Sequence, residues 1–221
     1  MTDPVAFFLS VAYVTGVLAT VELLRRREVA SRRVLRALVH AAVAAWILPT
    51  TLLFRSALWA ALLPLLFAGI NLACWRTGRF RAFSQPGEQT VGIVFHPLAI
   101  AAVILACWPE ALRPIAVASV LVMGWADPLA AVVGGAVKSP TFTPLGERKS
   151  VAGSLAMFSA SLAVVTGVAW ATGQPGNWLT VLAAAAVATA AELFSARGSD
   201  NLSVTWGLAG ALWLLGWGGA S

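Results

Sequence analysis

Long apolar runs without a charged residue recur along the whole chain of 221 residues, separated by short polar stretches. A transmembrane helix needs about 20 mostly apolar residues. Eight segments approach this requirement, the last two least well because they are short or rich in Ala and Gly. The sequence therefore predicts an all-α, polytopic transmembrane helix bundle of eight spans, or seven if one of the last two does not cross. The predicted spans are residues 4–24, 37–54, 57–75, 91–108, 115–137, 151–172, 178–194 and 202–217.

Composition excludes most other classes of protein. Hydrophobic residues make up 59% of the chain and charged residues 11%, whereas a soluble domain carries roughly 25% charged residues. The formal net charge of +6 does not indicate a nucleic-acid-binding protein, because the basic residues lie between apolar segments and not in one tract. With no internal repeat and no soluble segment, residues 1–221 are predicted to form a single integral membrane domain.

The basic residues predict an orientation. If the eight spans are correct, one set of loops holds thirteen Lys and Arg residues and the alternate set holds only Arg55 and Arg113. Cytoplasmic loops carry the excess of Lys and Arg. We therefore expect the polar loops, and any site they form, to face the cytoplasm, with both termini outside.

Asp127 falls roughly halfway through the fifth predicted span, where an ionisable group costs about 2.5–3.5 kcal/mol on insertion scales. Pro128 follows it and suits the first turn of a helix. This pair predicts a broken helix near Asp127 and Pro128, with Asp127 as the N-cap of the second half. The carboxylate either binds a divalent cation or only caps its own helix.

Other polar residues gather near the predicted cytoplasmic ends of the spans. Glu192 lies close to the end of the seventh span and Asp200 just before the eighth, where it suits an N-cap. Together with Asp127 they are candidate Mg²⁺ ligands, because Mg²⁺ in phosphoryl-transfer sites uses one or two carboxylates plus substrate phosphates. Glu192 could equally extend to the interface.

The stretch KSVAGS at 149–154 begins the sixth predicted span. A helix start offers free backbone N–H groups and a partial positive charge, which suit a phosphate. Taken singly, Lys149 and Arg148 are also typical cytoplasmic anchors and Gly153 a packing residue. Of the two histidines, His40 follows an Arg-rich loop and is a candidate for contact with a phosphate or lipid headgroup. His96 is interpreted as an interfacial hydrogen-bonding residue.

Three motifs resemble those of the polyprenol kinase family of CTP-dependent lipid kinases, which includes phytol kinase, dolichol kinase and a diacylglycerol kinase. They are ADPLAAVVG at 126–134, KSVAGSLAMF at 149–158 and SDNLSV at 199–204. The second is most similar to the phytol kinase form. The likeness covers roughly the second half of the chain, so the functional core is expected at about 91–221. Ala126, Ala131 and Ser199 depart from the family pattern, in which Gly, Asp and Asp are common.

The resemblance implies transfer of the γ-phosphate of a nucleoside triphosphate, expected to be CTP, to the hydroxyl of an isoprenoid alcohol such as phytol or geranylgeraniol. It implies catalytic roles for Asp127, Lys149 and Glu192 and Mg²⁺ bound by Asp127, Glu192 and Asp200. It further implies nucleotide contacts from a set of small and basic residues: Arg148, Lys149, Ser150, Gly153, Ser154 and Asn201.

Two alternatives stay open at this point. A cytidylyltransferase that forms a CDP-lipid carries a motif related to ADPLAAVVG, although the C-terminal signature of those enzymes does not occur here. A non-enzymatic transporter or assembly subunit could use a broken helix as a substrate site.

Overall fold

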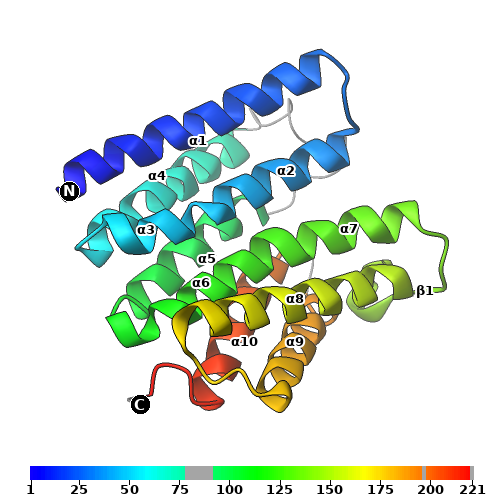
Figure 1. The fold of residues 1–221 in the computed structure, drawn as a ribbon. Helices are drawn as coiled ribbons and strands as arrows, with labels where there is room; N and C mark the ends of the chain where they lie inside the picture. The colour runs from blue at the N-terminus through cyan, green and yellow to red at the C-terminus, as the bar shows by residue number, and fades with distance from the viewer. Residues whose placement is uncertain (78–91, 196–197, 220–221) are drawn as a thin grey trace.

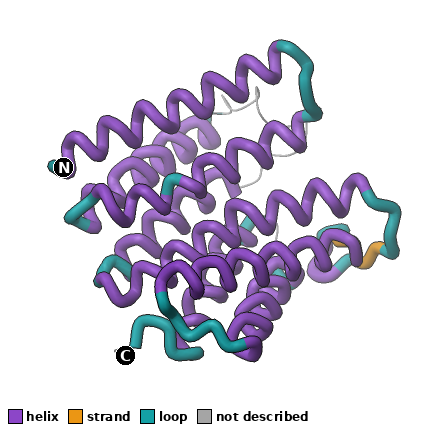
Figure 2. Tube along the Cα trace, viewed as in Figure 1, coloured by secondary structure: helices purple, strands orange, loops and turns teal. Residues whose placement is uncertain are grey.

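The computed structural model describes residues 1–77, 92–195 and 198–219, which fold into a bundle of helices with one small ribbon of two strands (Figures 1 and 2). Each predicted span overlaps a helix. Val91, the first residue of the fourth predicted span, and Arg79, Arg81 and Arg197, which entered the orientation count, lie outside the described residues.

The elements follow one another along the chain with short connections. They are α1 (Asp3–Arg26), α2 (Arg32–Ala45), α3 (Ile47–Leu53), α4 (Ala57–Arg76), α5 (Gly92–Ala106), a 3₁₀ turn (Glu110–Leu112), α6 (Arg113–Leu121), a π-helical segment (Val122–Ala126), α7 (Asp127–Ala136), β1 (Thr141–Phe142), a second 3₁₀ turn (Pro144–Gly146), β2 (Lys149–Ser150), α8 (Val151–Thr172), α9 (Trp178–Leu193) and α10 (Asp200–Leu214).

Within the described residues, five helices are long and apolar enough to cross a membrane, and they identify a multi-pass membrane protein. They are Asp3–Arg26, Arg32–Leu53, Ala57–Arg76, Glu110–Ala136 and Val151–Thr172. Helices α5 and α9 are apolar but shorter. The helical class of the prediction is confirmed, while a full crossing by each of the eight segments remains a prediction.

Helix α6 and its continuation into α7 form the centre of the bundle. In the most apolar window of Glu110–Ala136, 72% of the residues are buried, against 17 to 28% in the other four long helices. An outer helix of a membrane bundle faces lipid, so apolar residues remain exposed on α1, α4 and α8. Figure 1 shows α6 and α7 enclosed between α2 on one side and α8 on the other.

Helices α1 and α2 run antiparallel, as do α7 and α8, which brings the loops that join each pair to the same end of the bundle (Figure 1). Between α1 and α2, Tyr13 Oη donates to the carbonyl of Ala42 and Trp46 Nε1 donates to Ser10 Oγ. At one end, Trp217 Nε1 donates to the carbonyl of Pro175, so the end of the described chain lies beside the α8–α9 loop. The α1–α2 loop and the α7–α8 loop lie together at the other end, called the polar end below (Figure 1).

The predicted break at Asp127 and Pro128 is wrong in form, because the backbone stays helical through both residues. Asp127 has φ −62° and ψ −50°, and its side chain does not act as an N-cap. Instead, residues Val122–Ala126 just before it wind as a π-helix. Such a segment widens one turn and is frequent at functional sites. It also accommodates Pro128, which lacks the N–H that a regular helix would use.

The π-helical segment packs closely against α2. A Cβ on Gly124 would lie 2.0 Å from the Cβ of Ala44 and 3.2 Å from the carbonyl oxygen of His40. Trp125 Nε1 donates to the carbonyl of Ala41 at 2.9 Å. The central helix and α2 are therefore fixed to each other one turn before Asp127.

Candidate active site

The α7–α8 connection folds back on itself and presents Lys149 at the start of α8. Strands β1 and β2 pair antiparallel, with Phe142 opposite Lys149 and Thr141 opposite Ser150. Ser150 has extended dihedrals, and its Oγ accepts from the N–H of Gly153 at 3.1 Å, so it is the N-cap of α8. The predicted helix start at Val151 is confirmed by this cap.

The first N–H groups of α8 are not free, contrary to the prediction made for a phosphate site. The N–H of Val151 donates to the carbonyl of Pro140, that of Ala152 to Ser139 Oγ, and that of Gly153 to Ser150 Oγ. The sequence could not show these acceptors, because two of them, Ser139 and Pro140, come from the connection that precedes β1. A phosphate bound at this end would therefore be contacted mainly by side chains.

Gly153 lies where α8 crosses α7 at very short range. A Cβ on Gly153 would approach the carbonyl oxygen of Ala130 to 3.0 Å, and one on Gly134 would lie 2.7 Å from Ser150 Oγ. Ser154 Oγ donates to the carbonyl of Ser150 at 3.2 Å. The packing interpretation of Gly153 thus has direct support, and this crossing holds α8 against the helix that carries Asp127.

Lys149 forms an ion pair with Glu192, a residue of α9 that is 43 positions away. Its Nζ lies 2.5 Å from Glu192 Oε1 and 3.4 Å from Glu147 Oε2. The side chains of Lys149 and Glu192 are 14% and 8% exposed. Burial lowers the pKa of Lys149, but the hydrogen bond and charge of Glu192 outweigh that effect, and the net pKa is raised. Lys149 is therefore held as a cation.

Asp127 is half-buried at the start of α7 and lies within electrostatic range of several of the predicted site residues. These neighbours are the carboxylates Asp200 and Glu192 and the cations Lys149 and Arg36. Three predicted site residues, Lys149, Glu192 and Asp200, are thus electrostatic neighbours of Asp127. We call Arg36, Asp127, Lys149, Glu192 and Asp200 the charged cluster.

The carboxylates of this cluster suit a divalent cation that is bound jointly by the protein and by substrate phosphates. They suit a cation bound by protein side chains alone less well. Among the described residues, no three His, Cys, Asp or Glu side chains form a group that could hold a metal ion. Glu192 is engaged by Lys149, which leaves Asp127 and Asp200 as mutually repelling neighbours. One or two carboxylates are what Mg²⁺ takes when phosphates supply its other ligands.

A second set of polar residues adjoins the charged cluster through Asn201. His96 Nδ1 lies 3.1 Å from Asn201 Oδ1, so His96 is a hydrogen-bonding residue as interpreted, but it is buried. The ring of His40 packs against that of His96 with centroids 4.2 Å apart. His40 is therefore turned into the bundle, and its predicted contact with a phosphate or headgroup stays untested. Sequence reasoning missed the contact between His96 and Asn201, since 105 positions separate them.

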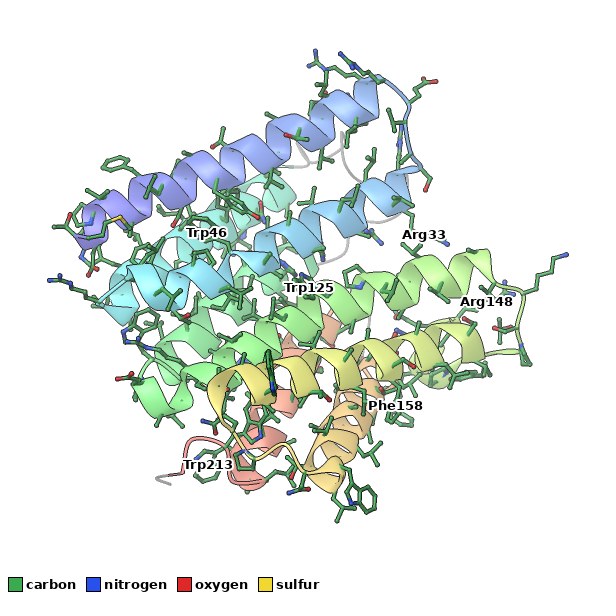
Figure 3. The ribbon with its side chains drawn as sticks, viewed as in Figure 1. Arg33, Trp46, Trp125, Arg148, Phe158 and Trp213 are labelled. Atoms are coloured by element: carbon green, nitrogen blue, oxygen red, sulfur yellow. The ribbon has the colours of Figure 1, made fainter. Side chains whose placement is uncertain are left out.

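The basic residues nearest the surface frame the polar end. Arg148 is exposed, and Arg33 from α2 lies over Gly135 at the end of α7. Figure 3 shows Arg33 and Arg148 at this end, whereas Trp46 and Trp213 lie toward the opposite end. The charged cluster therefore lies beneath a rim of exposed positive charge, an arrangement suited to an anionic ligand.

The fold and this cluster define a multi-pass helical membrane protein with a cluster of ionisable side chains at one end. The chain is 31% identical over 218 residues to a protein named phytol kinase from Synechocystis sp., covering 98% of this chain and 92% of that relative. The chain belongs to the phytol kinase family. No family model matches it, and no solved structure matches it.

Proposed function

We propose that this protein is a membrane-embedded lipid kinase that transfers the γ-phosphate of CTP to the hydroxyl of an isoprenoid alcohol, with phytol or a similarly short prenol as the first candidate. The observation that carries the proposal is the convergence of the three family-like motifs on Asp127. Lys149 and Glu192 form an ion pair beside it, and Asp200 lies within its electrostatic range. Membership of the phytol kinase family supports the class of reaction.

Phosphoryl transfer depends mainly on positioning and on neutralising charge. In the proposed site, Asp127 and Asp200 would hold Mg²⁺ together with the nucleotide, and Glu192 would be a further candidate ligand. When bound, the cation would supply neutralising charge to the phosphate oxygens. Lys149 exchanges its contact with Glu192 for one with a phosphate, and the exposed Arg148 approaches from the rim. The start of α8 is held in place by Ser150, Gly153 and Ser154. In this proposal, these three residues border the nucleotide at the start of the helix.

The polar end is proposed to face the cytoplasm, where nucleoside triphosphates are found. The support is the distribution of basic residues between the two alternating sets of predicted loops, thirteen against two over the full sequence. Each of the eight helical segments crosses the bilayer in this proposal. The lipid alcohol then enters laterally from the membrane with its hydroxyl at the level of Asp127.

The test uses membranes that contain the protein, Mg²⁺, a panel of lipid alcohols and phosphatidate. CTP is labelled at the α-phosphate in one series and at the γ-phosphate in the other. Transfer of the γ-label to a lipid alcohol is the expected result, and it also identifies the preferred alcohol. Incorporation of the α-label would instead show a CDP-lipid-forming enzyme. Transfer of neither label would contradict the kinase proposal and favour a non-enzymatic role.

A further inference from the structure

Among the described residues, one ring nitrogen of His96 has a hydrogen-bond partner and the other has none. His96 is only 8% exposed, and its Nδ1 lies 3.1 Å from Asn201 Oδ1. Its Nε2 is buried and has no hydrogen-bond partner in the part of the chain that the structure describes. Buried polar atoms in native proteins are nearly always paired, so such an atom indicates a strained site or a missing ligand.

The hydrogen bonds of Asn201 determine which nitrogen of His96 carries the proton. Asn201 Nδ2 lies 3.4 Å from the carbonyl oxygen of Gly92 and 3.4 Å from Asp200 Oδ1. Both atoms are acceptors, so the amide NH₂ faces them and the amide oxygen faces His96. That oxygen can only accept, and Nδ1 must therefore be the donor. In the neutral ring, Nε2 is then an acceptor with a free lone pair.

His96 is linked to the charged cluster by a closed path of neighbouring residues. Asn201 follows Asp200, and Asp200 is an electrostatic neighbour of Asp127. From the other side, the ring of His40 packs against His96, and Arg36 interacts with both His40 and Asp127. The residue that carries the unpartnered nitrogen is thus linked, through Asn201 on one side and His40 on the other, to the groups that are proposed to hold the nucleotide.

Resting on the proposed kinase function, we propose that His96 is the general base and that its Nε2 accepts the hydroxyl proton of the lipid alcohol. As that proton moves to Nε2, the alcohol oxygen forms a bond to the γ-phosphorus. The bond from that phosphorus to the bridging oxygen breaks, and its electron pair leaves with the nucleoside diphosphate. His96 becomes an imidazolium and later returns its proton to water. Asn201 is a positioning residue that keeps the acceptor on Nε2.

Kinetics of His96→Gln test this role, because the amide keeps a polar group but is not a base. General-base catalysis contributes about 10²–10⁴-fold. In His96→Gln, we expect kcat for γ-phosphate transfer to fall by about 10²-fold or more, with the KM for CTP unchanged. In His96→Gly, we expect added imidazole to restore activity. Ser161→Ala is the matched control, since Ser161 Oγ is also buried without a partner but lies on α8, away from the cluster. Retained kcat in His96→Gln would overturn the proposal.

A measurement on the wild-type protein covers the case in which the variants do not fold. The chain contains only two histidines, so ¹⁵N-histidine NMR gives a spectrum simple enough to assign with His40→Gln. We expect His96 to show a protonated Nδ1 and a free Nε2. Addition of the alcohol with a non-hydrolysable CTP analogue should move the Nε2 resonance upfield. A protonated Nε2, or no change on addition, would overturn the proposal.

The two proposals can fail separately. If the wild-type protein transfers no γ-label to any alcohol, the kinase function itself fails. If transfer occurs but His96→Gln keeps its kcat, the function stands and only the role of His96 is wrong.

Discussion

At the scale of single residues, the ion pair of Lys149 and Glu192 is a buried structural contact, and the proposed function gives Lys149 a second role in binding the nucleotide. In the proposed mechanism, Lys149→Met removes a charge-assisted contact to phosphate, worth about 1.5–3 kcal/mol, so we expect roughly a 10- to 150-fold rise in the KM for CTP. It also leaves Glu192 buried without its cation, at a cost of about 3–5 kcal/mol in stability. Kinetics and thermal unfolding in detergent measure the two effects.

The double variant Lys149→Met, Glu192→Gln separates these effects, because it removes the unpaired charge. We expect it to recover much of the melting temperature while the KM for CTP stays high. Lys138→Met is the control, since Lys138 is the only other lysine and is exposed. An unchanged KM in Lys149→Met would return Lys149 to a purely anchoring role.

The residues of the site were largely identifiable from sequence, but their contacts were not. The three motifs pointed to Asp127, Lys149 and Asp200, and the structure brings these near one another. The partners Glu192 for Lys149 and Asn201 for His96 lie 43 and 105 positions away. Such pairs depend on helix packing, which hydropathy does not encode. The acceptors that occupy the first N–H groups of α8 come from a loop whose conformation no motif specifies.

At the scale of elements, the contact between α2 and the π-helical segment positions both His40 and Asp127. Gly124→Ala would place a methyl group 2.0 Å from the Cβ of Ala44. Overpacking of this kind costs about 1–3 kcal/mol, so we expect a lower melting temperature and reduced γ-phosphate transfer.

Gly167→Ala on α8 is the matched control for that substitution. Nothing lies within 4 Å of the added methyl group, and Ala is favoured over Gly in a helix by up to about 1 kcal/mol. Its melting temperature should be unchanged or higher. If Gly124→Ala matched Gly167→Ala in stability and activity, the close contact would not position the site.

The same element shows why sequence predicted a discontinuity but not its form. Pro128 removes one backbone hydrogen bond, and a chain can respond by ending a helix or by widening one turn. The choice depends on what surrounds it. Here the residues from Pro114 to Gly124 are buried among other helices, where a true break would leave several backbone groups without partners. A single π-helical turn leaves fewer backbone groups without partners.

At the scale of the whole molecule, the antiparallel packing places both described ends of the chain opposite the charged cluster. The proposed orientation can be tested with single introduced cysteines. The background is Cys74→Ser, Cys107→Ser, because both native cysteines are free thiols that could react with the label. The exposed positions Thr143 at the polar end and Glu110 at the other end suit this purpose. In intact cells, we expect an impermeant maleimide to label Glu110→Cys and to spare Thr143→Cys. The reverse pattern would invert the topology.

The central claim is that the charged cluster at the polar end performs γ-phosphate transfer. The most direct test compares wild-type protein, Asp127→Asn and Glu110→Gln in the γ-labelled CTP assay, with each variant checked for membrane insertion and melting temperature. Both substitutions replace an acid by its amide, but Glu110 is exposed at the opposite end. We predict that Asp127→Asn folds yet loses transfer by about 10²-fold or more, while Glu110→Gln matches wild type. Wild-type rates in a folded Asp127→Asn protein would contradict the account.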